Sequence, residues 1–266
     1  MRIALVSMDQ QWLSKDKNFG RCESLTHIAA THTCDLIVFP EMTLTSYCLD
    51  VEAIAESVHS SPTLKRFEYL ARDTETSIIF GAVLMESANR KPENVLCLAR
   101  KNGEAVPVYS KLHGFSFVGE DKVLSSGNRL GMISIGDLRL GCSICYDLRF
   151  PDMFSALALN CNAVVTIANW PAARVAHWRS LLVARAIENQ LFVLGVNRIG
   201  TDGNGLQYES SSMIVSPDGK VLQPVFSFGE LDIYDIDLEE VLQYRSSFPT
   251  VRDKRYDLYR EFYEQR

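Results

Sequence analysis

Several features that indicate a membrane or nucleic-acid protein are missing from this sequence. No apolar run approaches the roughly 18 residues that a membrane-spanning helix needs. The apolar run in the opening MRIALVSMDQQW is too short for the core of a signal peptide. Lys and Arg number 27 against 33 Asp and Glu, a net charge of -6, so there is no basic excess of the kind that nucleic acid attracts. We therefore expect a cytoplasmic protein that binds neither membranes nor nucleic acid.

The cysteines also lack the spacing of a disulfide scaffold or a zinc site. There are seven cysteines in 266 residues, an odd number, and a chain of this size can fold without disulfide bonds. Cys142 and Cys145 stand three apart, but no second Cys or His pair accompanies them at zinc-finger spacing. Cys142 lies inside the apolar run LRLGCSI rather than at a helix start, which disfavours a redox motif. We expect reduced, mostly buried thiols and no metal, with a reversible Cys142–Cys145 disulfide as the alternative.

The remaining sequence is typical of one large α/β domain spanning 1–266, with 47% hydrophobic and 23% charged residues. Helices are predicted near 21–32, 61–74, 152–160 and 174–189, and a hairpin over 211–223. Because hairpins are mixed with βα alternation, we expect two mixed sheets packed together with helices outside. The charged end, 252–266, is interpreted as a surface or subunit-contact tail. Eleven short apolar runs predict strands, at 2–6, 35–39, 77–84, 95–99, 106–109, 131–135, 138–144, 163–167, 191–196, 211–216 and 230–237.

The predicted helix 174–189 has one apolar face. Val175, Trp178, Leu182 and Ala186 repeat at intervals of three and four. Its charged residues are expected away from this face, at the surface or at a subunit seam. They are Arg179, Arg185 and Glu188.

Cys145 is the best candidate for a nucleophile. It follows a predicted strand, and Pro151 suits the first turn of the next helix, so Cys145 occupies a tight strand-to-helix turn. Such a thiol needs a base and a nearby cation or N–H dipoles. Glu41 and Lys111 directly follow two other predicted strands, and the carboxyl ends of strands share one crevice in open α/β folds. Taken singly, each is more typical of a surface residue; together they indicate a site.

Seven segments that span nearly the whole chain carry family-specific motifs: FPEM (39–42), YSKLHGF (109–115), GED (119–121), CYDLRFPDMF (145–154), ANWPAARVAHWRSLLVARAIENQ (168–190), GVNRIGTDGNGLQY (195–208) and SSFPTVRD (246–253). They resemble the nitrilase superfamily of carbon–nitrogen hydrolases, most closely its ω-amidase-like branch. The resemblance implies a four-layer α-β-β-α sandwich, a homodimer or higher homo-oligomer, no cofactor, and hydrolysis of a small amide such as 2-oxoglutaramate. By that resemblance, Glu41, Lys111 and Cys145 form a catalytic triad and Glu120 is a second active-site glutamate.

Further residues are candidates for substrate contact. The backbone N–H of Tyr146 would bind an oxyanion with Lys111. Arg149 and Arg174 could hold a substrate carboxylate, or could instead pair with Asp147 or Glu188 to hold the fold. Three more residues are expected to line the pocket, although aromatic residues in such runs are more often core. They are Phe115, Asn169 and Trp170.

Departures from the family pattern leave the substrate open. Ser110 stands where Asp is common, Gly114 where Leu is common, and Tyr208-Glu209-Ser210 interrupts a Y-x-G-x-S pattern. The alternatives are a deaminated glutathione amidase, a nitrile hydrolase, and a non-catalytic binding protein on the same fold. Tyr146-Asp147 argues against nitriles, because nitrilases usually have Trp-Glu after the cysteine.

Overall fold

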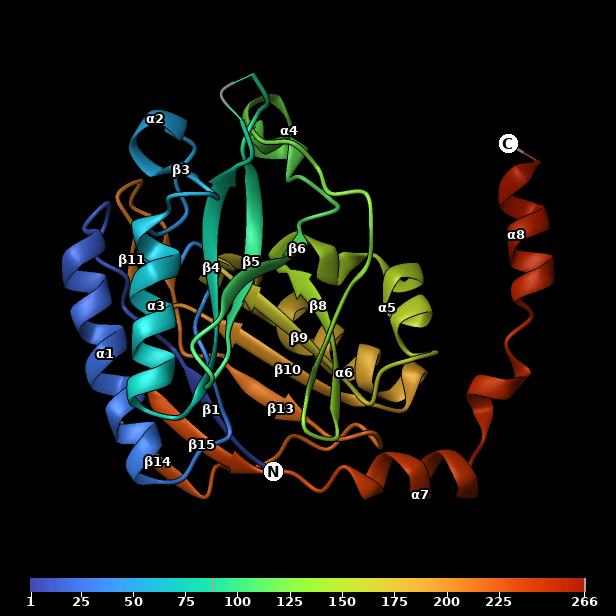
Figure 1. Cartoon of the computed structure of the whole chain (residues 1–266). Helices are drawn as coiled ribbons and strands as arrows, with labels where there is room; N and C mark the ends of the chain where they lie inside the picture. Colours follow the sequence, from blue (N-terminus) through green and yellow to red (C-terminus); the bar gives the residue numbers. More distant parts are fainter. Residues whose placement is uncertain (88, 266) are drawn as a thin grey trace.

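The computed structural model describes residues 1–87 and 89–265, which form two mixed β-sheets packed face to face (Figure 1). The first sheet has the spatial order β14 (Phe226–Phe228), β15 (Leu231–Asp235), β1 (Arg2–Val6), β2 (Leu36–Val38), β4 (Ser77–Met85), β5 (Glu93–Ala99) and β6 (Ala105–Ser110), with β3 (Glu56–Ser57) paired to β4. The second has the order β13 (Met213–Val215), β10 (Phe192–Asn197), β9 (Ala163–Ala168), β8 (Leu138–Ile144) and β7 (Gly131–Ile135).

Helices cover the outer face of each sheet. Helices α1 (Lys15–Thr31) and α3 (Pro62–Asp73) pack on the first sheet, and α5 (Pro151–Leu157) and α6 (Val175–Asn189) pack on the second. Along β1, Ile3 and Leu5 point between the sheets, while Ala4 and Val6 point towards α1 and α3. A strand buried on both faces reads as a continuous apolar run, which is why these strands were predictable. The four-layer α-β-β-α sandwich is confirmed.

All eleven predicted strands are present, and the differences lie in short or polar elements. Helix α1 begins at Lys15 rather than near 21, and the prediction missed this start because the first turn is polar. Helix α5 ends at Leu157 rather than near 160. The 211–223 hairpin turns at Gly219 and pairs Val215 with Val221. The elements not predicted are β3, β14, β11 (Gly200–Thr201), β12 (Gln207–Tyr208), α2 (Val51–Ile54), α4 (Glu120–Val123), α7 (Glu239–Ser247) and α8 (Tyr256–Glu264), with short 3₁₀ turns between some of them.

Helix α6 corrects one expectation. Trp178, Leu182 and Ala186 are buried as predicted, but Arg185 is buried too. Its Nε and Nη2 donate to the Leu148 carbonyl at 3.1 and 2.8 Å, and its Nη1 pairs with Glu188 at 2.8 Å. The prediction that Arg185 lies at the surface is wrong. A long charged side chain can enter a packed interface when its donors find partners there.

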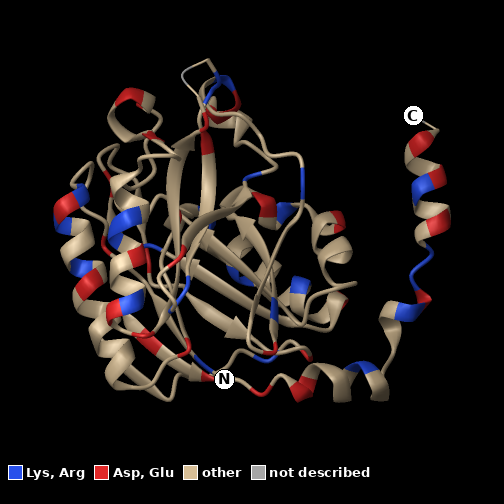
Figure 2. Cartoon of the chain, in the orientation of Figure 1, with Lys and Arg blue, Asp and Glu red and all other residues tan. Residues whose placement is uncertain are grey.

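The C-terminal segment forms an arm of α7 and α8 that runs away from the two sheets (Figure 1). Figure 2 shows Lys and Arg interspersed with Asp and Glu along α1, α3 and this arm. Among the described residues, no helix combines the length and apolar character required to cross a membrane.

Candidate active site

Glu41, Lys111, Cys145 and Asn169 follow β2, β6, β8 and β9, respectively, at one common edge of the sandwich. The ammonium Nζ of Lys111 lies 3.1 Å from Glu41 Oε1 and 2.8 Å from Glu120 Oε2. All three of these charged side chains are at most 2% exposed. The predicted meeting of strand ends is therefore confirmed, although the residues are far apart in the chain.

Cys145 stands at a sharp turn between β8 and α5. Its φ of 46° lies in the left-handed region, which non-glycine residues seldom adopt, and it opens the 3₁₀ turn Cys145–Arg149. The half-buried thiol faces the Asn169 carbonyl, with Sγ 3.9 Å from the oxygen. Cys142 is fully buried on β8, and all seven cysteines are free. The turn thus points one thiol towards a cavity and leaves the other in the core.

A glycine allows the Glu41 loop to lie against β4. A Cβ at Gly81 would lie 2.4 Å from Met42 N and 2.8 Å from the Glu41 Cα. The Gly81 N–H also donates to Thr43 Oγ1 at 2.9 Å, and Gln10 Nε2 donates to the carbonyl oxygens of Glu41 and Met42 at 3.0 Å. Any side chain at position 81 would displace the loop that carries the carboxylate.

The Glu41 carboxylate is fixed by two further donors. Asn94 Nδ2 donates to Oε1 at 2.7 Å, and the Asn169 N–H donates to Oε2 at 2.9 Å. Asn94 also reaches Glu120 Oε1 at 3.1 Å, so one amide bridges both carboxylates. Sequence reasoning missed Asn94, because it lies at the amino end of β5, which runs antiparallel to β4 and so starts at this edge.

Glu120 receives a set of donors of its own besides Lys111 and Asn94. Its Oε2 accepts the Phe115 N–H at 2.7 Å and the Tyr47 hydroxyl at 3.3 Å. Burial, with Glu120 adding to it, raises the pKa of Tyr47, so the hydroxyl stays a donor. Tyr47 was not predicted either, since it lies in a loop that matches no motif.

The charges explain the resting protonation states. Burial alone would lower the pKa of Lys111, but Glu41 and Glu120 hold that pKa well above its usual range. Burial would raise the pKa of Glu120, yet Lys111 and the N–H donors lower it. Burial, with Glu41 adding to it, raises the pKa of the Cys145 thiol well above its usual range despite the opposing effect of Lys111. The cluster at rest is therefore a protonated amine beside a neutral thiol, which must lose its proton to act as a nucleophile.

Lys111 and Cys145 line a cavity of about 80 Å³, whereas Glu41 and Glu120 are not among its lining residues. All six residues predicted for substrate contact also line it: Phe115, Tyr146, Arg149, Asn169, Trp170 and Arg174. Five lining residues were not predicted. They are Tyr47, Val118, Pro171, Leu206 and Tyr208. Tyr208 is the last residue of the segment 195–208, which resembles the family.

Arg149 and Arg174 are cations without a carboxylate partner among the described residues. Arg149 lies over the Trp170 ring, 4.7 Å from its centroid, and Arg174 lies 5.9 Å from the Phe115 ring. The alternative that they pair with Asp147 or Glu188 is wrong, because those carboxylates bind other groups.

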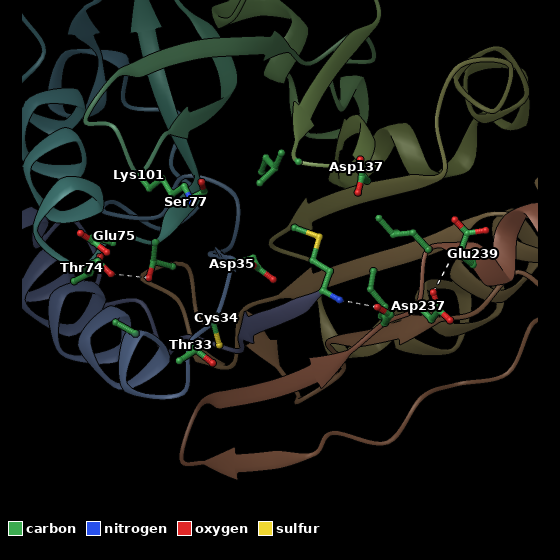
Figure 3. Close-up of a pocket in the computed structure, with 17 residues that line it drawn as sticks. Thr33, Cys34, Asp35, Thr74, Glu75, Ser77, Lys101, Asp137, Asp237 and Glu239 are labelled. Carbon is green, nitrogen blue, oxygen red and sulfur yellow. Dashed lines mark hydrogen bonds between the residues drawn. The ribbon is translucent and has the colours of Figure 1, made fainter.

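A larger cavity, of about 730 Å³, lies at the other edge of the sandwich (Figure 3). It is lined by groups that precede strands, including Asp35 before β2 and Asp137 before β8. Figure 3 shows several acidic side chains there, among them Glu75, Asp237 and Glu239, together with Lys101. None of these four side chains forms a salt bridge within the described part of the chain. The reactive grouping is therefore at the smaller cavity. Among residues 1–87 and 89–265, no three His, Cys, Asp or Glu side chains are grouped as metal ligands.

The comparisons with known proteins agree with this geometry. Residues 2–246 match the family model described as carbon-nitrogen hydrolase. The chain belongs to this family. It is 32% identical to omega-amidase YafV of Escherichia coli, over 95% of this chain and 96% of that protein. It is 31% identical to 2-oxoglutaramate amidase of Bacillus subtilis, over 97% and 98% of the two chains. The predicted superfamily and branch are confirmed.

Solved structures show the same fold. A CN-hydrolase superfamily protein from Xanthomonas campestris, which has an arsenic adduct in its active site, is 28% identical with a TM-score of 0.87, covering 96% of this chain and 97% of that one. An amidase from Nesterenkonia sp. has a TM-score of 0.84 at 24% identity, covering 98% and 96%. At that lower identity the likeness concerns the fold alone.

Proposed function

We propose that this carbon–nitrogen hydrolase is a cysteine-dependent amidase. Its reaction would release ammonia from the terminal amide of a small carboxylic acid, such as 2-oxoglutaramate. The observation that carries the proposal is the buried Glu41–Lys111–Glu120 cluster, whose Lys111 lines the same cavity as the half-buried Cys145 thiol. The E. coli and B. subtilis relatives, an omega-amidase and a 2-oxoglutaramate amidase, support the same reaction.

In the first step, Cys145 Sγ attacks the amide carbon while its proton passes to Glu41. The thiol is neutral at rest, so this transfer is required, and such general base catalysis contributes typically 10²–10⁴-fold in rate. The carbonyl π electrons move onto oxygen, giving a tetrahedral oxyanion. Lys111 Nζ and the Tyr146 N–H stabilise that charge, since one such donor is worth about 3–4 kcal/mol.

The intermediate then collapses to a thioester. The C–N bond breaks, and the departing nitrogen takes the proton held by Glu41 and leaves as ammonia. Glu41 next accepts a proton from water as the water attacks the thioester carbon, and returns it to sulfur when the acid leaves. Glu120 does not exchange protons in these steps; it holds the Lys111 ammonium in position through contacts of 2.8 and 3.0 Å.

The two arginines favour an anionic substrate. Arg149 and Arg174 face the cavity without carboxylate partners of their own, and guanidinium groups bind carboxylates bidentately. Phe115 and Trp170 line the same cavity as Cys145 and carry these cations on their rings. A short linear acid amide would therefore place its charge on the arginines and its amide on the thiol.

The test is ammonia release from 2-oxoglutaramate, deaminated glutathione and a simple nitrile under identical conditions. We expect 2-oxoglutaramate to have the highest kcat/KM. A preference for deaminated glutathione favours the alternative suggested by a Dictyostelium discoideum relative of that name, 27% identical over 93% of this chain and 91% of the relative. Ammonia from none of the three would favour a binding protein and overturn the proposal.

We further propose that the chain forms a homodimer through its C-terminal arm. The arm exposes aromatic side chains, with Phe262 and Tyr263 each 61% exposed, and large exposed apolar side chains grouped on one element are typical of an interface. Light scattering should give twice the mass of the chain for the wild type and the monomer mass for Phe262→Ser/Tyr263→Ser. A monomeric wild type would refute the dimer.

A further inference from the structure

Asp147, two residues after Cys145, is a buried carboxylate that the proposed reaction does not use. Its side chain is fully buried, and four donors converge on it. Oδ1 accepts the His113 N–H at 3.0 Å and the His113 ring Nδ1 at 2.8 Å. Oδ2 accepts the Ile144 N–H at 2.9 Å and the Tyr109 hydroxyl at 2.7 Å. Each oxygen is therefore saturated by two donors.

The four donors belong to two chain segments that carry different parts of the active site. Ile144 ends β8 and immediately precedes Cys145, whereas Tyr109 and His113 flank Lys111 on either side. The Leu112 N–H also donates to the Tyr109 hydroxyl at 3.0 Å, which adds a second link within the lysine segment. The Asp147 carboxylate thus joins the segment that carries Lys111 to the turn that carries Cys145.

We propose that Asp147 is a positioning residue that fixes Lys111 relative to Cys145, with His113 and Tyr109 as its partners. This inference rests on the proposed amidase function for its kinetic effect, but not for its effect on thiol reactivity. Neither Asp147 nor its partners contacts the reacting atoms. Their contribution is to hold the ammonium where it stabilises charge on sulfur and on the oxyanion.

A carboxylate is required at position 147 because its two oxygens bind backbone N–H groups of different segments. An amide of the same shape has one acceptor oxygen, and its NH₂ group must face either the Ile144 N–H or the His113 N–H. One of the two segments then loses its backbone bond in a buried site. The Tyr109 hydroxyl does not relieve this, because even when it accepts from the amide NH₂ group, the Ile144 N–H beside it still has no acceptor.

The His113 ring extends the same link towards the cavity wall. It stacks on Phe150 with ring centroids 3.7 Å apart and an angle of 10° between the planes. Phe150 in turn meets the Tyr146 ring edge-on at 5.2 Å, and Tyr146 lines the cavity. The Asp147 contacts therefore order both the charged and the aromatic sides of the site.

The test compares Asp147→Asn with Glu56→Gln, a matched acid-to-amide change away from the cavity. Glu56 also accepts several donors, including the Thr63 N–H at 3.1 Å, Thr63 Oγ1 at 2.8 Å and Lys15 Nζ at 2.8 Å, but these hold the start of α3. Melting temperatures, amidase kcat and KM, and the rate of iodoacetamide labelling of Cys145 are measured for both variants, with activity assayed well below both melting points.

Both variants should melt lower than the wild type. Only Asp147→Asn should lose kcat, by about a hundredfold, because small displacements of catalytic groups have effects of that size. Its Cys145 labelling at pH 8 should slow as well, since Lys111 favours the thiolate. Wild-type kcat and labelling in Asp147→Asn, despite a lowered melting temperature, would show that Asp147 only supports the fold and would overturn the inference.

Two further variants keep the inference testable if Asp147→Asn does not fold. Tyr109→Phe and His113→Ala each remove one donor and leave both backbone bonds to Asp147, and each should lower kcat and labelling more than Glu56→Gln does. Unchanged values in both would refute the role. A wild type that hydrolyses no amide would instead refute the proposed function, while the labelling rates would still decide the role of Asp147.

Discussion

Replacing Lys111 with methionine removes the ammonium from between two buried carboxylates while keeping much of the side-chain volume. In the wild type, Nζ lies 3.1 Å from Glu41 and 3.0 and 2.8 Å from the two oxygens of Glu120. Without it, two negative charges remain buried and face each other across Asn94. We expect Lys111→Met to be inactive and markedly less stable.

Removing one partner from a buried ion pair typically costs about 3–5 kcal/mol. With an unfolding entropy of about 2.1 cal/mol/K per residue, the 266 residues give roughly 0.6 kcal/mol/K, so the melting temperature should fall by roughly 5–9 °C. Glu120→Gln in the same chain removes one of the two uncompensated charges. The double variant should therefore regain part of the stability lost in Lys111→Met, which calorimetry can measure as a coupling energy.

The pH dependence follows from the direction of the Glu120 shift. In the wild type the pKa of Glu120 is lowered, so its stabilising contribution is present above its unfolded pKa, about 4.3, and is lost as the pH falls through the lowered value. In Lys111→Met, burial without the ammonium raises that pKa instead, so protonation restores stability on acidification. The difference in melting temperature between the wild type and Lys111→Met should be largest at neutral pH and should become smaller towards pH 5. Equal stability of wild type and Lys111→Met, or strictly additive effects with Glu120→Gln, would refute this account of the cluster.

Three further predictions concern other parts of the site. Arg174→Ala should raise KM for 2-oxoglutaramate at least about tenfold while barely changing KM for a neutral amide. The control Arg179→Ala, which changes an exposed arginine on α6, should alter neither KM. Equal effects of Arg174→Ala on both substrates would contradict a contact between Arg174 and the substrate carboxylate. Gly81→Ala should cost about 1–3 kcal/mol and most of the activity, whereas Gly20→Ala, which meets nothing within 4 Å, should leave activity intact. Because the pKa of the Cys145 thiol is raised, its labelling rate by iodoacetamide should keep rising from pH 7 to pH 9, and a plateau below pH 8 would show that the thiolate is already formed.

The sequence could predict the groups that follow buried strands, and it missed those placed by tertiary contacts. Glu41, Lys111 and Cys145 each follow an apolar run, so the topology of the sheets brings them to one edge. Asn94 begins a strand that runs the other way, and its role as a bridge depends on a pairing that no local pattern indicates. Arg185 resembles a surface residue until its partner, the Leu148 carbonyl, is placed beside it.

The same distinction holds for the elements. Strands of five or more residues with apolar runs were predicted, while β3, β11 and β12 have two residues each, too few for any periodicity. The cytoplasmic location and the single domain over 1–266 stay predictions. A Cβ at Gly114 would meet the Asp121 backbone at an ordinary 3.4 Å, so no close approach requires glycine at this position.

The most direct test of the central claim is ammonia release from 2-oxoglutaramate by Cys145→Ser and Cys145→Ala, with Cys142→Ala as the matched control three residues away. We predict that both Cys145 variants lose at least about a thousandfold in kcat, while Cys142→Ala keeps most of its activity. Near-normal turnover in either Cys145 variant would show that this thiol is not the nucleophile.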